Sequence, residues 1–326
     1  MPLLTTWFLR ALVVVLATGL AAIPGQASAR PVVPRATALP ALTFGVSLPD
    51  APGSMQSLED LAARLGRRPT QVMWFDAWSR GTGFPTQQAA SVAAFGATPV
   101  ITWEPWDPSR GTDQPTYSLK AIAAGLHDAY VTTWAKQARA YGQPVTLRFA
   151  HEMNGTWYPW AAGVNGNTAA DYVAAWKRVR GVFTRLKATN VSWSWSPNVP
   201  YPGSTPLASL FPGDAQVSTV ALDGYNWGGL LPGTTWQTFL DVFDDGHGEV
   251  RSFTSKPIAI GEVGAPEVGG DKAAWIRDMF ATLATRPEGL TGLTGFTWFS
   301  HFKEADWRID SSPTAFEAFR TGLATY

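Results

Sequence analysis

Eight short apolar segments recur along this chain, each followed by a segment with helical periodicity, and this alternation constrains the fold most strongly. The expected strands are rich in β-branched and aromatic residues and cover 42–48, 71–75, 98–103, 144–150, 191–195, 218–224, 257–262 and 295–299. Strands that alternate with helices pair in parallel, and eight such units favour a closed barrel over an open sheet. The prediction is an α/β fold, a single (β/α)8 TIM barrel.

The segments between the strands place apolar residues three or four positions apart, which is the spacing of one helix face. Helices are expected at 57–65, 86–95, 126–141, 169–188, 236–253, 272–285 and 313–323. The fifth connection, 201–211, is Pro-rich and gives only a weak helical signal. No G-x-G-x-x-G or phosphate-binding loop follows an expected strand, which disfavours a nucleotide-binding fold.

The N-terminal residues have the pattern of an export signal. Residues 1–29 contain Arg10, then an apolar run, then an A-x-A cleavage site at 27–29. The apolar run is shorter than the roughly 20 residues of a membrane span, so we predict a cleaved signal peptide and a secreted, extracellular protein without a membrane anchor. Residues 30–40 are rich in Pro and Ala and are predicted to be a disordered linker, and 41–326 form the predicted barrel domain.

Charge and composition point to a neutral partner. Lys plus Arg and Asp plus Glu both number 25, so no electrostatic argument favours a nucleic acid or an anionic membrane. The 16 tryptophans offer flat apolar faces that match those of sugar rings, which favours a polysaccharide as the partner. We take a monomer as the default oligomeric state.

The same composition limits the chemistry. The chain has no cysteine, which excludes a cysteine nucleophile and disulfides. Its four histidines show neither H-x-H nor H-E-x-x-H spacing, so no metal site is predicted, although distant strand ends could still assemble one.

Polar and aromatic residues cluster just after the expected strands. In a parallel barrel these positions converge on the carboxyl-terminal face, where active sites form. The clusters read W-F-D at 74–76, W-E-P-W at 103–106, H-E-M-N at 151–154, D-G-Y-N-W at 223–227, G-E-V-G at 261–264 and W-F-S-H at 298–301.

Two glutamates stand out in these clusters. Glu152 and Glu262 are each the first carboxylate after an apolar strand, the fourth and the seventh. Cleavage of a glycosidic bond with retention needs two carboxyl groups about 5 to 5.5 Å apart, one to protonate the leaving oxygen and one to attack the anomeric carbon. A lone glutamate at a strand end is more often a salt-bridged or solvated carboxylate, but the pair favours catalysis.

Longer stretches around these glutamates resemble a known family. R-F-A-H-E-M-N-G-T-W-Y-P-W at 148–160 resembles the fourth-strand signature of glycoside hydrolase family 26, and I-G-E-V-G at 260–264 is similar to its nucleophile strand. F-T-W-F at 296–299 and K-E-A-D-W-R at 303–308 also look like that family, so the resemblance spans 43–325.

The resemblance implies a retaining hydrolase of O-glycosidic bonds that needs neither a metal nor an organic cofactor. Its members include endo-β-mannanases and lichenases, so the implied substrate is β-1,4-mannan first. Mixed-linkage β-1,3-1,4-glucan and β-1,3-xylan remain as alternatives.

The resemblance also implies roles for individual residues. Glu152 matches the acid/base, and Glu262 matches the nucleophile that forms the glycosyl-enzyme intermediate. His151 is expected to contact the sugar next to the scissile bond, and Tyr225 to hydrogen-bond the nucleophile.

Aromatic and polar residues at other strand ends are further candidates for substrate binding. Trp298 matches an indole that stacks under the reacting sugar, and Trp157 matches an aromatic side chain of the acceptor side. Position alone adds Trp103, Glu104, Asp76, Asn226 and Trp227, for which an ordinary structural role is an equal alternative. Arg148 shares a strand face with Glu152 by alternation and is interpreted as structural support that pairs with an acid in the barrel interior.

Two functions of other classes remain open. One is a non-catalytic carbohydrate-binding protein on a decayed barrel, which the presence of both glutamates disfavours. The other is a metal-dependent hydrolase. The choice between endo and exo action and the number of sugar subsites depend on loops that the sequence does not specify.

Overall fold

The computed structural model describes residues 42–325, and these belong to the second of two compact units that divide between Leu39 and Pro40. The predicted signal peptide at 1–29 and linker at 30–40 lie outside the described residues and stay predictions. In the part of the chain from 42 to 325, no helix combines the length and apolarity that a membrane crossing requires.

Eight parallel strands close into one barrel in sequence order, which confirms the predicted (β/α)8 fold. The strands are β1 (Thr43–Ser47), β2 (Gln71–Ala77), β3 (Thr98–Glu104), β4 (Val145–Phe149), β5 (Val191–Trp195), β6 (Thr219–Tyr225), β7 (Ile258–Gly264) and β8 (Leu293–Phe299). The barrel closes where β1 pairs with β8, with Phe44 opposite Phe296.

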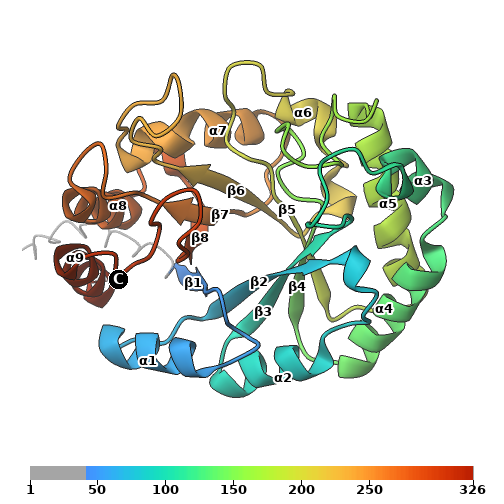
Figure 1. Cartoon of the computed structure of the whole chain (residues 1–326), viewed down its shortest axis with the longest axis horizontal. Coiled ribbons are helices and arrows are strands. Elements are labelled where there is room, and N and C mark those ends of the chain that lie inside the picture. Colours follow the sequence, from blue (N-terminus) through green and yellow to red (C-terminus); the bar gives the residue numbers. More distant parts are fainter. Residues whose placement is uncertain (1–41, 326) are drawn as a thin grey trace, which may run out of the picture. The chain divides into compact units, whose positions relative to one another are not determined.

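Helices surround this barrel on all sides (Figure 1). They are α1 (Gln56–Leu65), α2 (Thr86–Phe95), α3 (Leu119–Ala124), α4 (Asp128–Tyr141), α5 (Ala169–Arg185), α6 (Leu207–Leu210), α7 (Phe239–Phe253), α8 (Lys272–Thr285) and α9 (Pro313–Ala324). All seven predicted helices are present. The weak segment 201–211 contains only the four-residue α6, and α3 was not predicted.

Helix starts follow side-chain caps rather than the first apolar residue. The predicted helix 236–253 begins at Phe239, because Thr238 and Asp241 form a reciprocal capping box at that point. A second capping box, between Thr168 and Asp171, fixes the start of α5. Each box satisfies backbone N–H groups that the first helical turn leaves without partners.

Side chains alternate between the helix layer and the barrel interior along the strands. Phe44, Phe296 and Trp298 all pack against Phe319 of α9, so these positions of β1 and β8 face the helices. Polar residues face the interior, where Arg148 of β4 lies with an exposed fraction of 1%. The apolar core therefore lies mainly between the strands and the helices, and the interior carries the polar groups.

The β7 strand breaks this alternation next to its glutamate. Leu222 of β6 pairs with Ile260, but the next β6 residue, Asp223, pairs with Glu262, so Gly261 is an extra residue in β7. Such a bulge re-aims the side chains that follow it. Without it, Glu262 would share the helix-facing side of Ile260. A side chain at Gly261 would collide with Asp223, because a Cβ atom there would lie 2.3 Å from Oδ1 of Asp223.

Candidate active site

Glu152 lies just beyond the end of β4 in an uncommon backbone conformation. Its φ is 51° and that of Ala150 is 47°, both in the left-handed region, which costs non-glycine residues about 1 to 3 kcal/mol each. The Glu152 N–H donates to the carbonyl of Ser196 over 2.6 Å, and the indole of Trp160 donates to the carbonyl of His151 over 2.6 Å. These bonds hold the segment and direct the Glu152 side chain.

The surroundings of Glu152 favour its protonated form. Burial raises the pKa of Glu152 to about 8, with a further contribution from the charge of Glu262. The indole N–H of Trp157 donates to Oε2 of Glu152 over 2.6 Å and partly opposes this rise in pKa. Glu152 therefore holds a proton at neutral pH.

Glu262 lies across the interior from Glu152 and receives a hydrogen bond on each oxygen. Arg148 donates from Nη1 to Oε1 over 2.9 Å, and the hydroxyl of Tyr225 donates to Oε2 over 2.6 Å. One donor comes from β4 and the other from β6, so two strands fix the orientation of this carboxylate. A charged donor and a hydroxyl on separate oxygens suit a carboxylate acceptor.

Arg148 connects four strands at the centre of the barrel. Besides Glu262, it forms an ion pair with Asp223 and donates to Thr102 over 2.8 Å and to Ser196 over 3.0 Å. A buried cation requires such partners, because an unpaired charge in this interior would cost several kcal/mol, on the order of 3 to 5. Two acids thus partner Arg148 in the barrel interior.

His151, which directly precedes Glu152, is buried. Its Nε2 lies 3.1 Å from the hydroxyl of Tyr158, while its Nδ1 has no hydrogen-bond partner among the described residues. Burial, with the nearby charges of Arg148 and Lys303, holds the pKa of His151 well below its usual value. The imidazole is therefore neutral, with one nitrogen still available.

Glu104, at the end of β3, is another buried carboxyl group, and its charge interacts with that of Glu262. The indole of Trp106 donates to Oε2 of Glu104 over 3.2 Å. Burial raises the pKa of Glu104 to about 7, and the hydrogen bond from Trp106 opposes this rise. The charge of Glu262 raises the pKa further, and that of Lys303 lowers it. Glu104 can accept a hydrogen bond from a ligand hydroxyl group.

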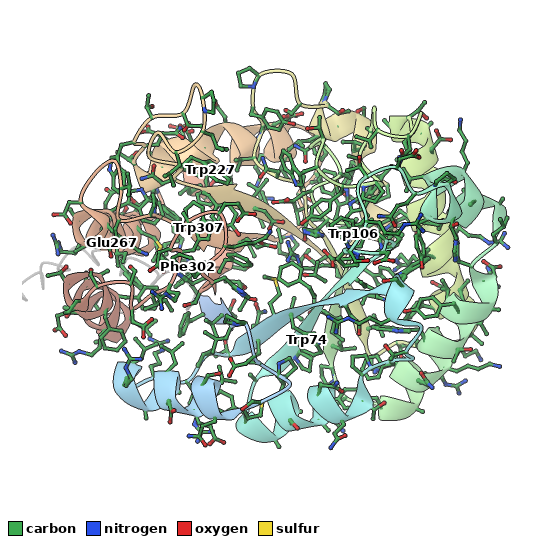
Figure 2. All side chains as sticks on the ribbon, viewed as in Figure 1. Trp74, Trp106, Trp227, Glu267, Phe302 and Trp307 are labelled. Atoms are coloured by element: carbon green, nitrogen blue, oxygen red, sulfur yellow. The ribbon has the colours of Figure 1, made fainter. Side chains whose placement is uncertain are left out.

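Aromatic rings lie on opposite sides of the barrel (Figure 2). Trp157 is 41% exposed and stacks on Tyr201, with ring centroids 5.8 Å apart. In Figure 2, Trp227 and Trp307 lie on the side of β6 to β8, and Trp106 lies across the barrel from them. Trp227 packs edge-on against Trp307 with centroids 5.2 Å apart. The rings that are at least partly exposed, those of Trp106, Trp157 and Trp227, can hold sugar rings, whereas Trp307 is buried and supports Trp227.

The prediction that Trp103 and Trp298 line the cleft is wrong, because both side chains face the helix layer. Trp103 is fully buried and stacks on Trp134 of α4 with centroids 4.4 Å apart. Trp298 is fully buried between Trp275 of α8 and Phe319 of α9. Strand alternation puts their neighbours inward instead, as the bond from Arg148 to Thr102 shows.

The prediction for Asn226 is also wrong. Its side chain is fully buried, and its Oδ1 accepts hydrogen bonds from the N–H groups of Gly228 and Gln237, each over 3.2 Å. Its Nδ2 donates to the carbonyl of Gln237 over 3.1 Å. Asn226 therefore braces the loop after β6 and does not face a ligand.

Asp76 lies outside the carboxyl cluster. It lines a groove of about 700 Å³ between the loops after β1 and β2, together with Trp74 and His301. Burial raises its pKa to about 6, while the nearby charge of Arg80 opposes the rise. Its Oδ1 has no hydrogen-bond partner among residues 42–325.

Several residues of the site were not predicted. Tyr201 supports Trp157, Trp106 contacts Glu104 and Tyr158 contacts His151. Trp106 and Tyr158 follow strand ends inside the W-E-P-W and W-Y-P-W clusters, so their positions carried a usable signal. Lys303 acts on the carboxyl groups from the loop after β8, and it opens the K-E-A-D-W-R stretch at 303–308, although no role was assigned to it there.

In the described part of the chain, no group of three or more His, Asp or Glu side chains is placed to hold a metal ion.

Comparisons with known proteins bear on this site. The family model described as glycosyl hydrolase family 26 matches residues 101–243. Endoglucanase H of Acetivibrio thermocellus is 35% identical over 274 residues, which cover 83% of this chain and 29% of that protein. Mannan endo-1,4-beta-mannosidase A and B of Caldalkalibacillus mannanilyticus is 33% identical over 136 residues, 39% of this chain and 23% of that protein. The chain thus spans less than a third of the length of either relative.

Solved structures show the same fold. A modular endo-β-1,4-mannanase from Cellulomonas fimi superposes with a TM-score of 0.65 at 16% identity, over 87% of this chain and 70% of that one. A family 26 β-mannanase from Bacteroides ovatus gives a TM-score of 0.63 at 15% identity, over 87% of each chain.

Proposed function

We propose that this chain, which belongs to glycoside hydrolase family 26, is a retaining endo-β-glycanase with Glu152 as acid/base and Glu262 as nucleophile. One observation carries the proposal. Glu152 has a pKa raised to about 8, whereas each oxygen of Glu262 accepts a hydrogen bond, from Arg148 or Tyr225. The two carboxyl groups thus have the opposite environments that an acid and a nucleophile require.

In the first step, the Glu262 carboxylate attacks the anomeric carbon while Glu152 transfers its proton to the glycosidic oxygen. The bond between the anomeric carbon and that oxygen breaks, and the acceptor sugar leaves as an alcohol. Trp157 donates a hydrogen bond to Glu152, the residue that protonates the leaving oxygen. The stacked rings of Trp157 and Tyr201 therefore lie on the side of the leaving sugar.

In the second step, Glu152 changes from acid to base. Ester formation removes the negative charge of Glu262, which is the second-largest cause of the raised pKa of Glu152. The pKa of Glu152 therefore falls, and its carboxylate takes a proton from the incoming water. The water oxygen bonds to the anomeric carbon and releases Glu262, so the configuration of the substrate is retained.

We propose a neutral β-linked polysaccharide as the substrate, with β-1,4-mannan first, because a mannosidase is among the relatives and the fold matches mannanases. Mixed-linkage β-1,3-1,4-glucan is the second candidate. It is favoured by the match to Endoglucanase H, which extends over 83% of this chain. That match covers only 29% of Endoglucanase H, so the activity in its name can belong to another part of that protein.

A polymeric substrate is consistent with secretion, which we propose on the basis of the N-terminal sequence pattern alone.

The test is reducing-sugar release from galactomannan, lichenan, β-1,3-xylan and carboxymethylcellulose, with Glu152→Ala and Glu262→Ala beside the wild type. Activity on one polymer that both substitutions abolish would identify the substrate class. Proton NMR of the first product would show the β anomer if the configuration is retained. A folded wild type that cleaves none of the four polymers would favour a carbohydrate-binding protein instead.

Azide separates the two carboxyl roles. With an activated aryl β-glycoside, Glu152→Ala should yield the β-glycosyl azide, because azide attacks an α-linked intermediate. Glu262→Ala should yield the α-glycosyl azide by a single displacement. The reverse pattern would exchange the roles assigned to the two residues.

A further inference from the structure

Lys272, the first residue of α8, is a buried cation outside the carboxyl cluster. It is 1% exposed, and all three N–H donors of its ammonium group have partners. It donates to the carbonyl of Asp306 over 3.0 Å, to the carbonyl of Arg308 over 2.8 Å and to the hydroxyl of Ser311 over 2.8 Å. An apolar side chain of similar size could fill this space without the cost of burying a charge. The three directed bonds therefore call for an explanation.

The two carbonyls flank Trp307 in the loop between β8 and α9. The carbonyl of Trp307 itself accepts a hydrogen bond from the indole of Trp298 over 2.7 Å. Three successive carbonyls, those of residues 306 to 308, are thus held by two buried side chains. We call Lys272 and Trp298 the carbonyl clamp. Trp298, which was expected to stack under a sugar, instead fixes this loop from the helix side.

The clamp determines where the Trp307 ring lies. This ring is 1% exposed and packs on Tyr225 with centroids 4.9 Å apart. Gly264 leaves room for the contact, because a Cβ atom there would lie 3.2 Å from Tyr225 and 3.3 Å from Trp307. Tyr225 in turn donates to Glu262 over 2.6 Å. A continuous set of contacts therefore runs from Lys272 to the nucleophile.

The loop after β7 is joined to the same clamp. The hydroxyl of Ser311 donates to Oε1 of Glu267 over 2.6 Å while it accepts from Lys272. Figure 2 shows Glu267 and Trp307 on the same side of the barrel, near α8. Glu267 therefore fixes the hydroxyl of Ser311, which accepts the hydrogen bond from the ammonium group of Lys272.

The charges around Lys272 keep it a donor. Burial lowers its pKa to about 8 and Arg308 adds to this, while Glu267, Asp306 and Asp310 oppose it. The ion pair of Arg308 with Asp306, 2.6 Å between Nη2 and Oδ2, holds those two charges together in the loop. At neutral pH the ammonium form therefore supplies all three hydrogen bonds.

We propose that Lys272 is a positioning residue for the nucleophile: it fixes Trp307 against Tyr225 and thereby aims the carboxylate of Glu262. The inference rests on the proposed function. A purely structural Lys272 would affect only the stability of the loop. A positioning role predicts in addition that loss of the clamp slows attack by Glu262.

Lys272→Met tests this, since Met keeps the length of the side chain and removes the donors. The substrate is a dinitrophenyl β-glycoside of the sugar that the wild type accepts, because dinitrophenolate leaves without a proton from Glu152. In single-turnover reactions with excess enzyme, kcat is the rate constant for formation of the glycosyl-enzyme, and we expect it to fall about tenfold or more, as misplacement of a reacting group by about 1 Å can cost a hundredfold. Lys272→Arg should restore part of kcat.

Arg251→Met is the matched control. Arg251 of α7 donates to the carbonyl of Lys256 over 2.6 Å, which is also a bond from a cation to a backbone carbonyl, away from the carboxyl cluster. It should lower stability with kcat within twofold of the wild type. If Lys272→Met does not fold, Ser311→Ala removes one acceptor of the clamp and should lower kcat about threefold.

Two results would overturn the inference. One is a folded Lys272→Met with kcat within twofold of the wild type, and the other is an unchanged kcat in Ser311→Ala if the first variant does not fold. A wild type that cleaves neither polymer nor aryl glycoside would overturn the proposed function, and this inference with it. An active wild type with an unaffected Lys272→Met would overturn this inference alone.

Discussion

The hydroxyl of Tyr225 donates a hydrogen bond to Oε2 of Glu262 over 2.6 Å, and the Tyr225 ring lies against Trp307 and Phe299. The donor is therefore held in place by aromatic contacts that do not depend on the hydrogen bond itself. Removal of the hydroxyl group alone should leave the ring where it is, so the bond can be tested without loss of packing.

Tyr225→Phe should lower kcat roughly 10- to 100-fold with a smaller change in KM, because a hydrogen bond to a charged group contributes about 1.5 to 3 kcal/mol. The measurement is steady-state kinetics on the preferred polymer and on an aryl glycoside. An unchanged melting temperature is the control for packing. If kcat stays within twofold of the wild type, Tyr225 does not orient the nucleophile.

Trp157→Phe should move the alkaline limb of kcat/KM to higher pH. The indole bond favours the charged form of Glu152 and opposes the rise of its pKa to about 8. Loss of the bond raises this pKa further, so the acid keeps its proton to higher pH. The pH profile should be measured with a substrate whose leaving group needs protonation.

Tyr201→Leu is the control for that experiment. It removes the stacking partner of Trp157 but leaves the bond to Glu152, so it should weaken substrate binding without moving the limb. An alkaline limb that stays in place in Trp157→Phe would mean that the bond does not tune the acid.

Asp76→Asn should stabilise the protein above pH 6. Burial raises the pKa of Asp76 from 3.8 to about 6, so folding takes up a proton across this window. The contribution of protonated Asp76 to the free energy of unfolding is therefore fully present below pH 3.8. It falls as the pH rises and is lost above about pH 6. Two pKa units correspond to about 3 kcal/mol, an upper limit for the gain.

Urea unfolding at pH 4 and pH 8 measures this difference. The free energy of unfolding of Asp76→Asn should exceed that of the wild type at pH 8 and approach it at pH 4. If Asp76→Asn raises the free energy of unfolding equally at both pH values, the titration of Asp76 is not the cause of the gain.

The sequence predicted the fold well, because β-branched apolar runs and helical spacing reflect burial directly. All eight strands and seven of the nine helices in residues 42–325 were expected, with errors at ends that side-chain caps decide. The carboxyl pair could be located because both glutamates follow apolar strands. Their orientation could not be predicted. Strict alternation from Ile260 would turn Glu262 toward the helices, and only the bulge at Gly261 turns it inward.

The errors among the aromatic residues have one physical cause. Tryptophans at strand ends suit both a sugar platform and the layer under the helices, and only the strand face distinguishes them. Trp103 and Trp298 occupy the helix-facing side, whereas Trp157 lies in a loop beyond the strand. Tyr201 could not be found because it reaches the site from a distant loop through a contact that no local pattern records. Lys303 lies in the K-E-A-D-W-R stretch, but that pattern does not show which groups its charge would act on.

Trp103→Phe tests the corrected position of Trp103. The indole is fully buried, stacks on Trp134 and donates to the hydroxyl of Tyr130 over 3.3 Å. Phe keeps one aromatic ring but leaves a cavity and removes the donor to Tyr130, so the free energy of unfolding should fall by roughly 2 to 4 kcal/mol. KM should stay within twofold of the wild type, because Trp103 faces the helices and touches no ligand. Chemical unfolding and polymer kinetics on the same preparation measure both quantities. A tenfold higher KM with an unchanged free energy of unfolding would mean that Trp103 contacts the substrate after all.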